Sequence, residues 1–282
     1  MGEAIEARQL RAGDRSQVLD FLMVDATENL VLIDSLARLG CAPRAGEIPP
    51  LLYGAFDGDR LLGVVLLRPC VSISAGMSEQ ILGRLLPHLL RVPSGLLKSD
   101  RRVVDPVWAA LERAGRESTI DRIEIGFRLC PDQIVAASPD LPGVARPARS
   151  EDLEELVYAA RASLWEEDRP DPADVDPVGF RRWVASRLSR ARIVSDQGRT
   201  VFVAYADVRR PEGWLIQGVY TWPEARRRGF ARRGMDATIR EAFASGASHV
   251  QLAVVEGNER ATALYRELGF EVFSELRTVL FS

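Results

Sequence analysis

The sequence predicts a mixed α/β (α+β) protein of two tandem domains that share one fold, each a mostly antiparallel central sheet flanked by helices. At 282 residues the chain is longer than a usual single domain. Residues 139–147 are rich in proline and break the apolar periodicity, as an interdomain linker does. The same order of helix and strand patterns occurs on both sides of this segment. Duplication of one fold explains that order, and two unrelated domains are the alternative.

The first half, expected to form a domain at 1–138, begins with two patterns of helical spacing, at 13–24 and 27–39. A hairpin follows that turns at Asp57-Gly58, a favourable dipeptide for a tight turn. Beyond it the patterns predict a strand segment at 71–74, a helix at 78–90, a strand at 95–98, a helix at 105–114 and a strand at 119–129.

The second half, expected to form a domain at 148–282, opens with apolar residues at helical spacing between 153 and 165. A second helix is predicted at 178–191, and a hairpin turns at Asp196-Gln197-Gly198 between strands at 192–195 and 200–206. The remaining patterns predict a strand at 214–222, a helix at 230–245, a strand at 249–255, a helix at 259–268 and a closing strand or pair of strands at 270–281.

The composition is that of a globular protein, with 46% hydrophobic and 27% charged residues. Its apolar runs are too short to cross a bilayer, and the N-terminus lacks a secretory signal pattern. The cysteines, Cys41, Cys70 and Cys130, are dispersed, and the only histidines are His88 and His249, so a metal site is not expected. We therefore expect a cytoplasmic protein with reduced thiols, no metal and no membrane partner.

The charge distribution favours a small anionic ligand. The net charge of −3 argues against a general nucleic-acid binder, and we expect no nucleic-acid partner. The residues after Leu141 carry equal numbers of acidic and basic side chains, yet five arginines gather within eight positions: Arg226, Arg227, Arg228, Arg232 and Arg233. A local cationic cluster in a neutral domain indicates a compact polyanion.

The sequence around these arginines suits a phosphate group. A predicted strand ends at Thr221-Trp222, and the run RRRGFA leads directly into a predicted helix. Unpaired N–H groups at a helix start bind phosphate, and Gly229 lets the backbone approach it closely. Ala231 keeps the next turn small. The alternative is a solvated basic loop that only caps the helix.

The segment PEARRRGFA resembles the acetyl-CoA signature of the GNAT superfamily of N-acetyltransferases, with Arg226, Gly229, Phe230 and Ala231 at its defining positions. The resemblance implies that the backbone of Arg226–Ala231, including Arg227 and Arg228, holds the pyrophosphate of coenzyme A. It implies that the end of the preceding strand, Val219, Tyr220 and Thr221, pairs with the pantetheine arm. Acetyl-CoA, or another acyl-CoA, is then the co-substrate.

A second match to the family follows at the expected distance, in EGNERATALYRELGF. It places Asn258, Ala261, Tyr265, Gly269 and Phe270 at the positions that the family commonly fills with these residue types. Asn258 stands where a helix begins and is suited to cap it. The resemblance implies that Tyr265 is the general acid for the departing thiolate, and the alternative is a half-buried core tyrosine.

The duplicated layout resembles a group of bacterial tandem GNAT-like proteins whose first copy is degenerate. Where the phosphate loop should occur, the first half reads VSISAGMSEQ, with one glycine and no basic residue. A hand alignment places Leu111 opposite Tyr265. We therefore predict that the first copy binds no coenzyme A and either supports the second copy or shapes the acceptor cleft.

Candidate residues for the base and the acceptor amine come from two loops. Glu256 follows the 249–255 strand and is the leading candidate for the general base, with an exposed loop carboxylate as the alternative. Trp165, Glu166 and Glu167, with Asp168 after them, are expected to contact a cationic acceptor. Because the second half has no cysteine, direct attack on the thioester is expected rather than an acyl-enzyme.

The function expected from these features is acyl transfer from acetyl-CoA to a primary amine of unknown identity. A module that senses acetyl-CoA without turnover is one alternative. A tandem transferase that uses another acyl donor, such as aminoacyl-tRNA, is the other, and the acidic balance weakens it. The oligomeric state is left open between a monomer and a homodimer.

Overall fold

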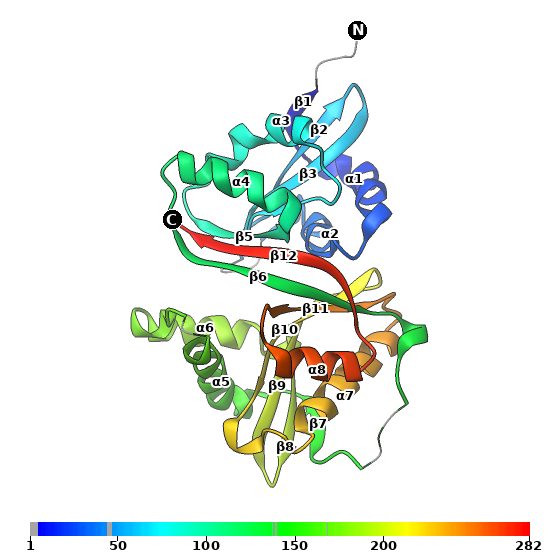
Figure 1. The fold of residues 1–282 in the computed structure, drawn as a ribbon, viewed down its shortest axis with the longest axis vertical. Coiled ribbons are helices and arrows are strands. Elements are labelled where there is room, and N and C mark those ends of the chain that lie inside the picture. Colours follow the sequence, from blue (N-terminus) through cyan, green and yellow to red (C-terminus); the bar gives the residue numbers. More distant parts are fainter. Residues whose placement is uncertain (1–4, 44–46, 137, 139, 168) are drawn as a thin grey trace. The chain divides into compact units, whose positions relative to one another are not determined.

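The computed structural model describes residues 5–282 apart from 44–46, 137, 139 and 168. Its backbone divides into two compact units. Unit 1 contains Met1–Gly126, Ala253–Asn258 and Val272–Ser282, and unit 2 contains Phe127–Leu252 and Glu259–Glu271. The fold is mixed α/β with mainly antiparallel strands and flanking helices, as the sequence predicts (Figure 1).

Unit 1 is built around a sheet of strand order β1-β2-β3-β4, in which all neighbours are antiparallel. The hairpin between β2 and β3 turns at the predicted dipeptide, where Gly58 has a φ of 56°. The strand β1 was not expected from the sequence. The elements of this unit are β1 (Glu6–Gln9), α1 (Arg15–Leu22), α2 (Leu30–Ala37), β2 (Leu51–Asp57), β3 (Arg60–Arg68), β4 (Ser72–Ile73), α3 (Glu79–Leu89), β5 (Gly95–Asp100), α4 (Arg101–Arg113), β6 (Ser118–Leu129) and β12 (Glu271–Phe281).

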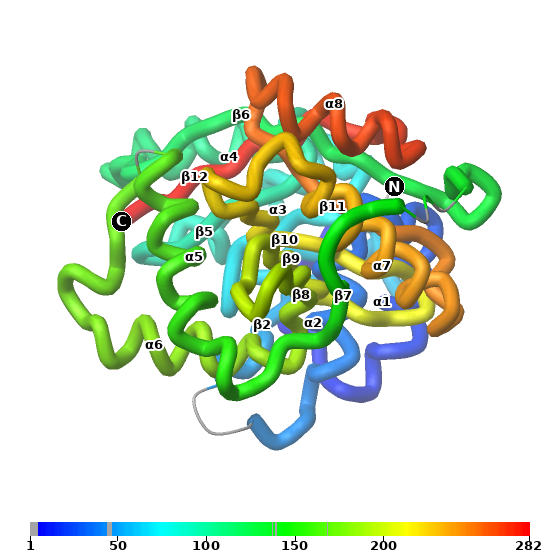
Figure 2. The backbone as a smooth tube through the Cα atoms, turned by 90° about the horizontal axis from the view of Figure 1, so that it is seen from below, coloured from blue at the N-terminus to red at the C-terminus, as the bar shows by residue number. Residues whose placement is uncertain are grey.

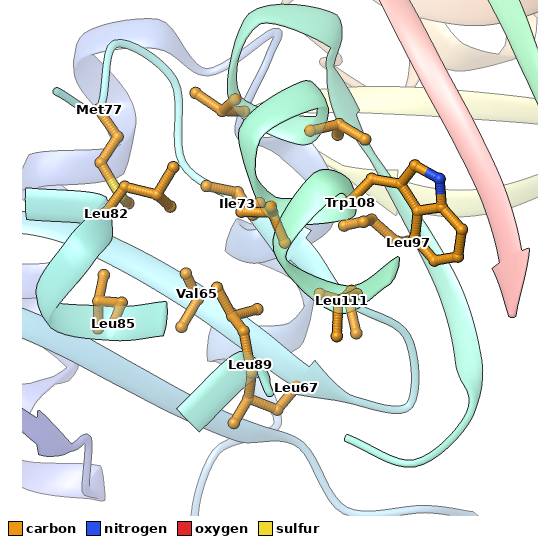
Figure 3. Close-up of a cluster of buried hydrophobic side chains, with 14 of the residues drawn as sticks. Val65, Leu67, Ile73, Met77, Leu82, Leu85, Leu89, Leu97, Trp108 and Leu111 are labelled. Atoms are coloured by element: carbon orange, nitrogen blue, oxygen red, sulfur yellow. The ribbon is translucent and has the colours of Figure 1, made fainter. Parts of the chain in front are cut away.

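Both faces of this sheet are covered by helices, and the alternation of side chains along β3 shows how. Val65 and Leu67 point into a cluster formed with α3 and α4, whose largest member is Trp108 (Figure 3). Val64 and Leu66, from the other face of the same strand, pack with α1 and α2. A strand buried on both faces reads as a continuous apolar run, which is why residues 61–67 carry no polar side chain.

The last strand of the chain belongs to unit 1. β12 pairs antiparallel with β5, from Leu276 opposite Asp100 to Phe281 opposite Gly95. Phe281 packs in the same cluster as Trp108, with 5.8 Å between their ring centroids. The last strand of the chain therefore packs with N-terminal elements. The domain limits predicted from the sequence, 1–138 and 148–282, stay a prediction.

Unit 2 has the strand order β7-β8-β9-β10-β11, antiparallel except for β10 and β11, which run parallel. Part of the predicted linker at 139–147 is instead a strand: β7 pairs with β8 from Val144 opposite Ser195. The sequence does not reveal this strand, because it has only four residues and its apolar residue Val144 is exposed. The elements of this unit are β7 (Val144–Pro147), α5 (Leu153–Glu166), α6 (Pro177–Ser186), β8 (Ala191–Asp196), β9 (Arg199–Arg210), β10 (Gly213–Thr221), α7 (Phe230–Ala244), β11 (Val250–Val255) and α8 (Glu259–Glu267).

Helices cover both faces of the sheet of unit 2 as well, with α5 and α6 on one side of β8–β10 and α7 on the other (Figure 2). Gly234 of α7 lies directly over the ring of Phe202, where a Cβ would come within 2.2 Å of that ring. The missing side chain therefore sets how closely α7 approaches β9. None of the helices in the described ranges combines the length and apolar character that a membrane span requires.

Unit 1 contains a buried ion pair. Glu124 of β6 is 3% exposed and accepts a hydrogen bond from Lys98, the only lysine of the chain. Arg122 donates a second hydrogen bond of 2.9 Å to the same carboxylate. Burial alone would raise the pKa of Glu124, but the charge and hydrogen bond of Lys98, with help from Arg122, outweigh it and lower the pKa to about 2.

Replacing Glu124 with glutamine should lower the free energy of unfolding at pH 7 by about 3 kcal/mol, because it leaves Lys98 without its anionic partner. The wild-type pair should stabilise the protein above the ordinary glutamate pKa and lose its contribution as the pH falls toward 2, whereas the variant should lack this acid-dependent loss. Urea unfolding between pH 2 and 7 measures both effects. Glu117→Gln, an exposed site, is the control, and equal losses in the two variants would contradict the assignment.

Candidate functional site

The loop between β10 and α7, which we call the phosphate loop (residues 222–229), contains two residues in the left-handed conformation. Arg227 and Gly229 both adopt left-handed φ angles, of 61° and 89°. Left-handed residues in such a loop turn successive N–H groups toward one side, which makes a concavity that binds anions. Gly229 is the N-cap of α7 and supplies no side chain to bond the first amides of the helix. These amides therefore present positive charge at a half-exposed surface, around Gly229 and Ala231.

The conformation of Gly229 explains why glycine stands there. A φ of 89° is costly for any residue with a Cβ, and a Cβ would also lie 3.2 Å from the side chain of Pro142. Sequence reasoning had assigned the glycine to close contact with a ligand. The structure assigns it first to the backbone conformation that exposes the amides.

The clustered arginines do not act as a group. Arg226 turns away from the loop: its Nε donates to the Thr221 carbonyl at 2.9 Å, and its Nη2 donates to both oxygens of Glu166, at 2.5 and 2.8 Å. It therefore joins the end of β10 to the end of α5 and contributes its main chain, rather than its guanidinium, to the loop.

The other arginines keep their charge near the surface. Arg228 and Arg232 form long, exposed ion pairs with Asp196 at 3.4 Å and with Glu267 at 3.3 Å. Arg227 is exposed and forms no ion pair with any residue that the structure describes. Such weak pairs exchange readily for a stronger anionic partner.

The end of β10 has an irregular edge. Its parallel ladder with β11 contains the pairs Trp214–Val250 and Leu215–Gln251 and goes no further within the described residues. Its register with β9 shifts between Gln217 and Tyr220, and Gly218 between them has a φ of 58°. Such a bulge redirects main-chain groups away from the ladder. The predicted pantetheine-binding residues, Val219, Tyr220 and Thr221, lie immediately beyond this point.

Four aromatic side chains gather where α5 and β10 end, and we call them the aromatic corner (Tyr158, Trp165, Tyr220 and Trp222). Tyr158 stacks on Trp222 at 6.5 Å and meets the edge of Trp165 at 6.5 Å, and Tyr220 meets Trp222 at 5.4 Å. Tyr158 and Trp165 are each half exposed, whereas Tyr220 and Trp222 are buried. The guanidinium of Arg161 lies over the ring of Trp165, 4.9 Å from its centroid, so Tyr158 offers the more open ring surface of the corner.

Glu166 joins the aromatic corner to the phosphate loop. The hydroxyl of Tyr220 donates to it at 3.2 Å, and Arg226 forms the ion pair described above. Burial, together with the charge of Glu166, raises the pKa of Tyr220 to about 12, so this hydroxyl keeps its proton and remains a donor. Glu167, in contrast, caps the helix and pairs with Arg169 at 3.4 Å, and Asp168 lies outside the described residues.

Tyr265 lies in α8 with its ring between Phe127 and Phe270, at centroid distances of 6.2 and 5.8 Å. Burial raises the pKa of its hydroxyl well above the usual range. None of the residues described by the structure hydrogen-bonds to that hydroxyl. Tyr265 therefore packs like a core tyrosine. Its hydroxyl keeps its proton and has no hydrogen-bond partner among the described residues.

Two predicted site residues lie in unit 1. Glu256 is exposed, its amide donates to the Ile123 carbonyl at 3.0 Å, and its carboxylate pairs with no described residue. Asn258 is exposed and directly precedes α8. The roles of Glu256 as the base and of Asn258 at the cofactor stay predictions.

The corresponding helix start in unit 1 differs from that of α7. Ser78 is the N-cap of α3, and its hydroxyl accepts a hydrogen bond from the amide of Ile81. Leu111, the hand-aligned counterpart of Tyr265, is buried in the apolar cluster. The first copy therefore caps its own helix with a side chain, as a helix without a phosphate ligand does.

Sequence reasoning missed Tyr158 and Trp222 as members of the site. Tyr158 precedes Trp165 by seven positions, which places both on one face of a helix, and this spacing was a usable signal. Trp222 gave no signal, because its contact with Tyr158 depends on how α5 packs against β10. As for metals, no cluster of potential ligands occurs among the described residues.

The comparisons with known proteins concern the family and the fold. The acetyltransferase (GNAT) family model matches residues 154–270, a segment that begins within α5 and ends just after α8. It includes the aromatic corner, the phosphate loop and Tyr265. No curated protein sequence matches the chain.

Solved structures share the fold over the whole chain, at identities that establish the fold alone. A Drosophila melanogaster protein superposes with a TM-score of 0.68 at 17% identity, covering 99% of each chain. A GCN5-related N-acetyltransferase from Sphaerobacter thermophilus gives 0.56 at 17% identity, covering 100% of this chain and 96% of its own. A tandem GNAT protein from the clavulanic acid biosynthesis pathway gives 0.53 at 17% identity, covering 98% and 97%.

Replacing Gly229 with leucine should weaken coenzyme A binding by more than tenfold, because the loop can no longer expose its amides in this conformation. Gly246→Leu is a matched control: Gly246 follows the other end of α7, has a φ of 84°, and faces open space. Both variants should lose similar stability, about 1–2 kcal/mol. Calorimetric titration with coenzyme A should separate them, and equal affinities would refute the phosphate-loop assignment.

Proposed function

We propose that the chain is an N-acyltransferase that moves an acetyl or other short acyl group from coenzyme A to a primary amine, a proposal supported by the match of residues 154–270 to the acetyltransferase (GNAT) family model. One observation carries the proposal most directly. The helix that follows β10 begins with a left-handed glycine and uncapped amides, in a half-exposed loop. A cofactor with a diphosphate group suits that backbone.

The residues of this region fit coenzyme A in three respects. The phosphate loop presents main-chain donors, and the exposed Arg227 adds an unpaired charge beside them. The irregular edge of β10 offers main-chain groups to an extended arm at Val219–Thr221. The bound thioester would supply an activated acyl group, so the protein needs no nucleophile of its own.

The acceptor amine is assigned to the aromatic corner. The half-exposed ring of Tyr158 attracts a cation, as the ring of Trp165 already does for the guanidinium of Arg161, and the carboxylate of Glu166 lies nearby at the end of α5. Arg226 partly neutralises that carboxylate. We therefore expect an amine that carries an apolar or aromatic portion, because rings supply more of this surface than charge does.

Acyl transfer requires the amine to lose a proton, since a free alkylamine has a pKa near ~10.4. Glu256 remains the candidate base, directly or through a water molecule. Tyr265 acts on the departing sulfur. A thiol has a pKa near ~8.5, so its thiolate is a weaker base than the phenolate of Tyr265, whose pKa is raised by burial. Tyr265 therefore stabilises the thiolate by donating a hydrogen bond and retains its proton.

Release of free coenzyme A from acetyl-CoA, measured across a panel of amines, tests this function. Turnover with at least one amine is the expected result. Saturable binding of acetyl-CoA without release on any amine would favour the sensing module instead.

Tyr265→Phe should lower kcat by roughly 10²-fold, because it removes the donor to the thiolate, and should leave the affinity for coenzyme A within about twofold. Steady-state kinetics and calorimetry measure the two quantities. Tyr205→Phe, which removes the hydroxyl of another buried tyrosine of unit 2, should change neither. An unchanged kcat in Tyr265→Phe would exclude this residue from the reaction.

Glu166→Gln should raise the KM for the amine roughly tenfold at saturating acetyl-CoA, because it removes the negative charge from the aromatic corner. The adjacent variant Glu167→Gln is the matched control, since Glu167 pairs with Arg169 instead. Initial rates over a range of amine concentrations distinguish them. Equal effects in the two variants would show that Glu166 has no special role in acceptor binding.

A further inference from the structure

Unit 1 contains a pocket of about 550 Å³ that the proposed reaction does not use. It lies where β3 ends and where the chain leaves α3 to enter β5. Its inner surface is largely apolar and includes Leu51, Leu67 and Val92. A volume of this size is typical of small-molecule sites.

The charged residues of this pocket are all basic. Arg68 and Arg91 line it, and no acidic residue does so among those the structure describes. Neither arginine forms an ion pair with a described residue. The neighbouring Arg38, in contrast, pairs with Asp34 at 3.4 Å and with Glu47 at 3.0 Å. Unpaired arginines beside an apolar surface favour an amphipathic anion.

Neutral polar groups complete the pocket. His88 stacks on Tyr53 with 4.0 Å between ring centroids, and burial together with the charge of Arg91 lowers the pKa of His88, so the ring is neutral at pH 7. Burial raises the pKa of the Cys70 thiol, against the opposing charges of Arg38 and Lys98. Cys70 is one of the residues that line the pocket.

The pocket is not the remnant of a coenzyme A site. The phosphate loop of the duplicated fold would precede α3, at Ser78, whereas the pocket includes His88 near the other end of that helix. The 11 residues of α3 separate the two places by about 16 Å. A helix C-terminus lacks the free amide groups with which a helix start holds a phosphate, so an anion here would depend on the arginine side chains.

We propose that this pocket binds a small apolar molecule that ends in a single carboxylate. The apolar wall receives the hydrocarbon portion, and Arg68 and Arg91 bind the carboxylate at the mouth. The first copy would then lack the coenzyme A site of the fold and have a different ligand site in another place. This inference does not depend on acyl transfer by unit 2.

Protection of Cys70 from a maleimide tests the proposal in the full chain carrying Cys41→Ser and Cys130→Ser. Octanoate should slow the labelling of Cys70 in a saturable way, and octanol should need roughly tenfold higher concentration, because it lacks the charge. Calorimetric titration of the same protein gives the octanoate affinity without relying on the thiol.

The double variant Arg68→Gln/Arg91→Gln should raise the half-protecting concentration of octanoate roughly tenfold and leave that of octanol unchanged. Arg60→Gln/Arg84→Gln removes the same charge from exposed positions outside the pocket and should change neither. The absence of protection, equal potency of octanol and octanoate, or equal effects of the two double variants would overturn the proposal. Inorganic phosphate that protects as well as octanoate would also overturn it.

Discussion

The account depends on one feature of the main chain: the amides at the start of α7 are left without a side-chain cap. The left-handed conformation at Gly229 turns the loop so that these amides meet at one surface. Two sets of contacts in unit 2 hold this arrangement. Gly234 allows α7 to lie closely over Phe202. Arg226 connects the loop to the end of β10 through the Thr221 carbonyl and to α5 through Glu166.

The two copies show how the same fold gains or loses such a site. In α7 the N-cap residue has no side chain, and five arginines occur within the loop and the first turns. In α3 the N-cap is a serine whose hydroxyl occupies one of the amides, and the loop before it has no basic residue. The two helix starts therefore differ in whether a side chain accepts a hydrogen bond from their first amides. The pocket at the other end of α3 is the site that we propose for a small apolar carboxylate.

Much of the fold was predictable because its elements carry strong local signals. The hairpin at Asp57-Gly58 and the helices at 153–166 and 230–244 follow from turn chemistry and apolar spacing. The strands β1 and β7 were missed because each has only four residues, and neither contains a buried side chain. The placement of β12 in unit 1 was not predictable, since pairing with β5 joins segments about 180 residues apart, and no local pattern reports such a contact.

The candidate site was predictable where it depends on motifs and unpredictable where it depends on packing. Gly229 and Tyr265 are candidates because they stand in motifs that resemble the GNAT family, whereas the direction of the Arg226 side chain and the contact between Tyr158 and Trp222 required the structure. The most direct test of the central claim is an amide-resolved NMR titration of the phosphate loop. Coenzyme A should shift the amide signals of Gly229, Phe230 and Ala231, and pantetheine, which lacks the diphosphate, should leave them in place. Saturable binding of coenzyme A that leaves these signals unmoved would contradict the account.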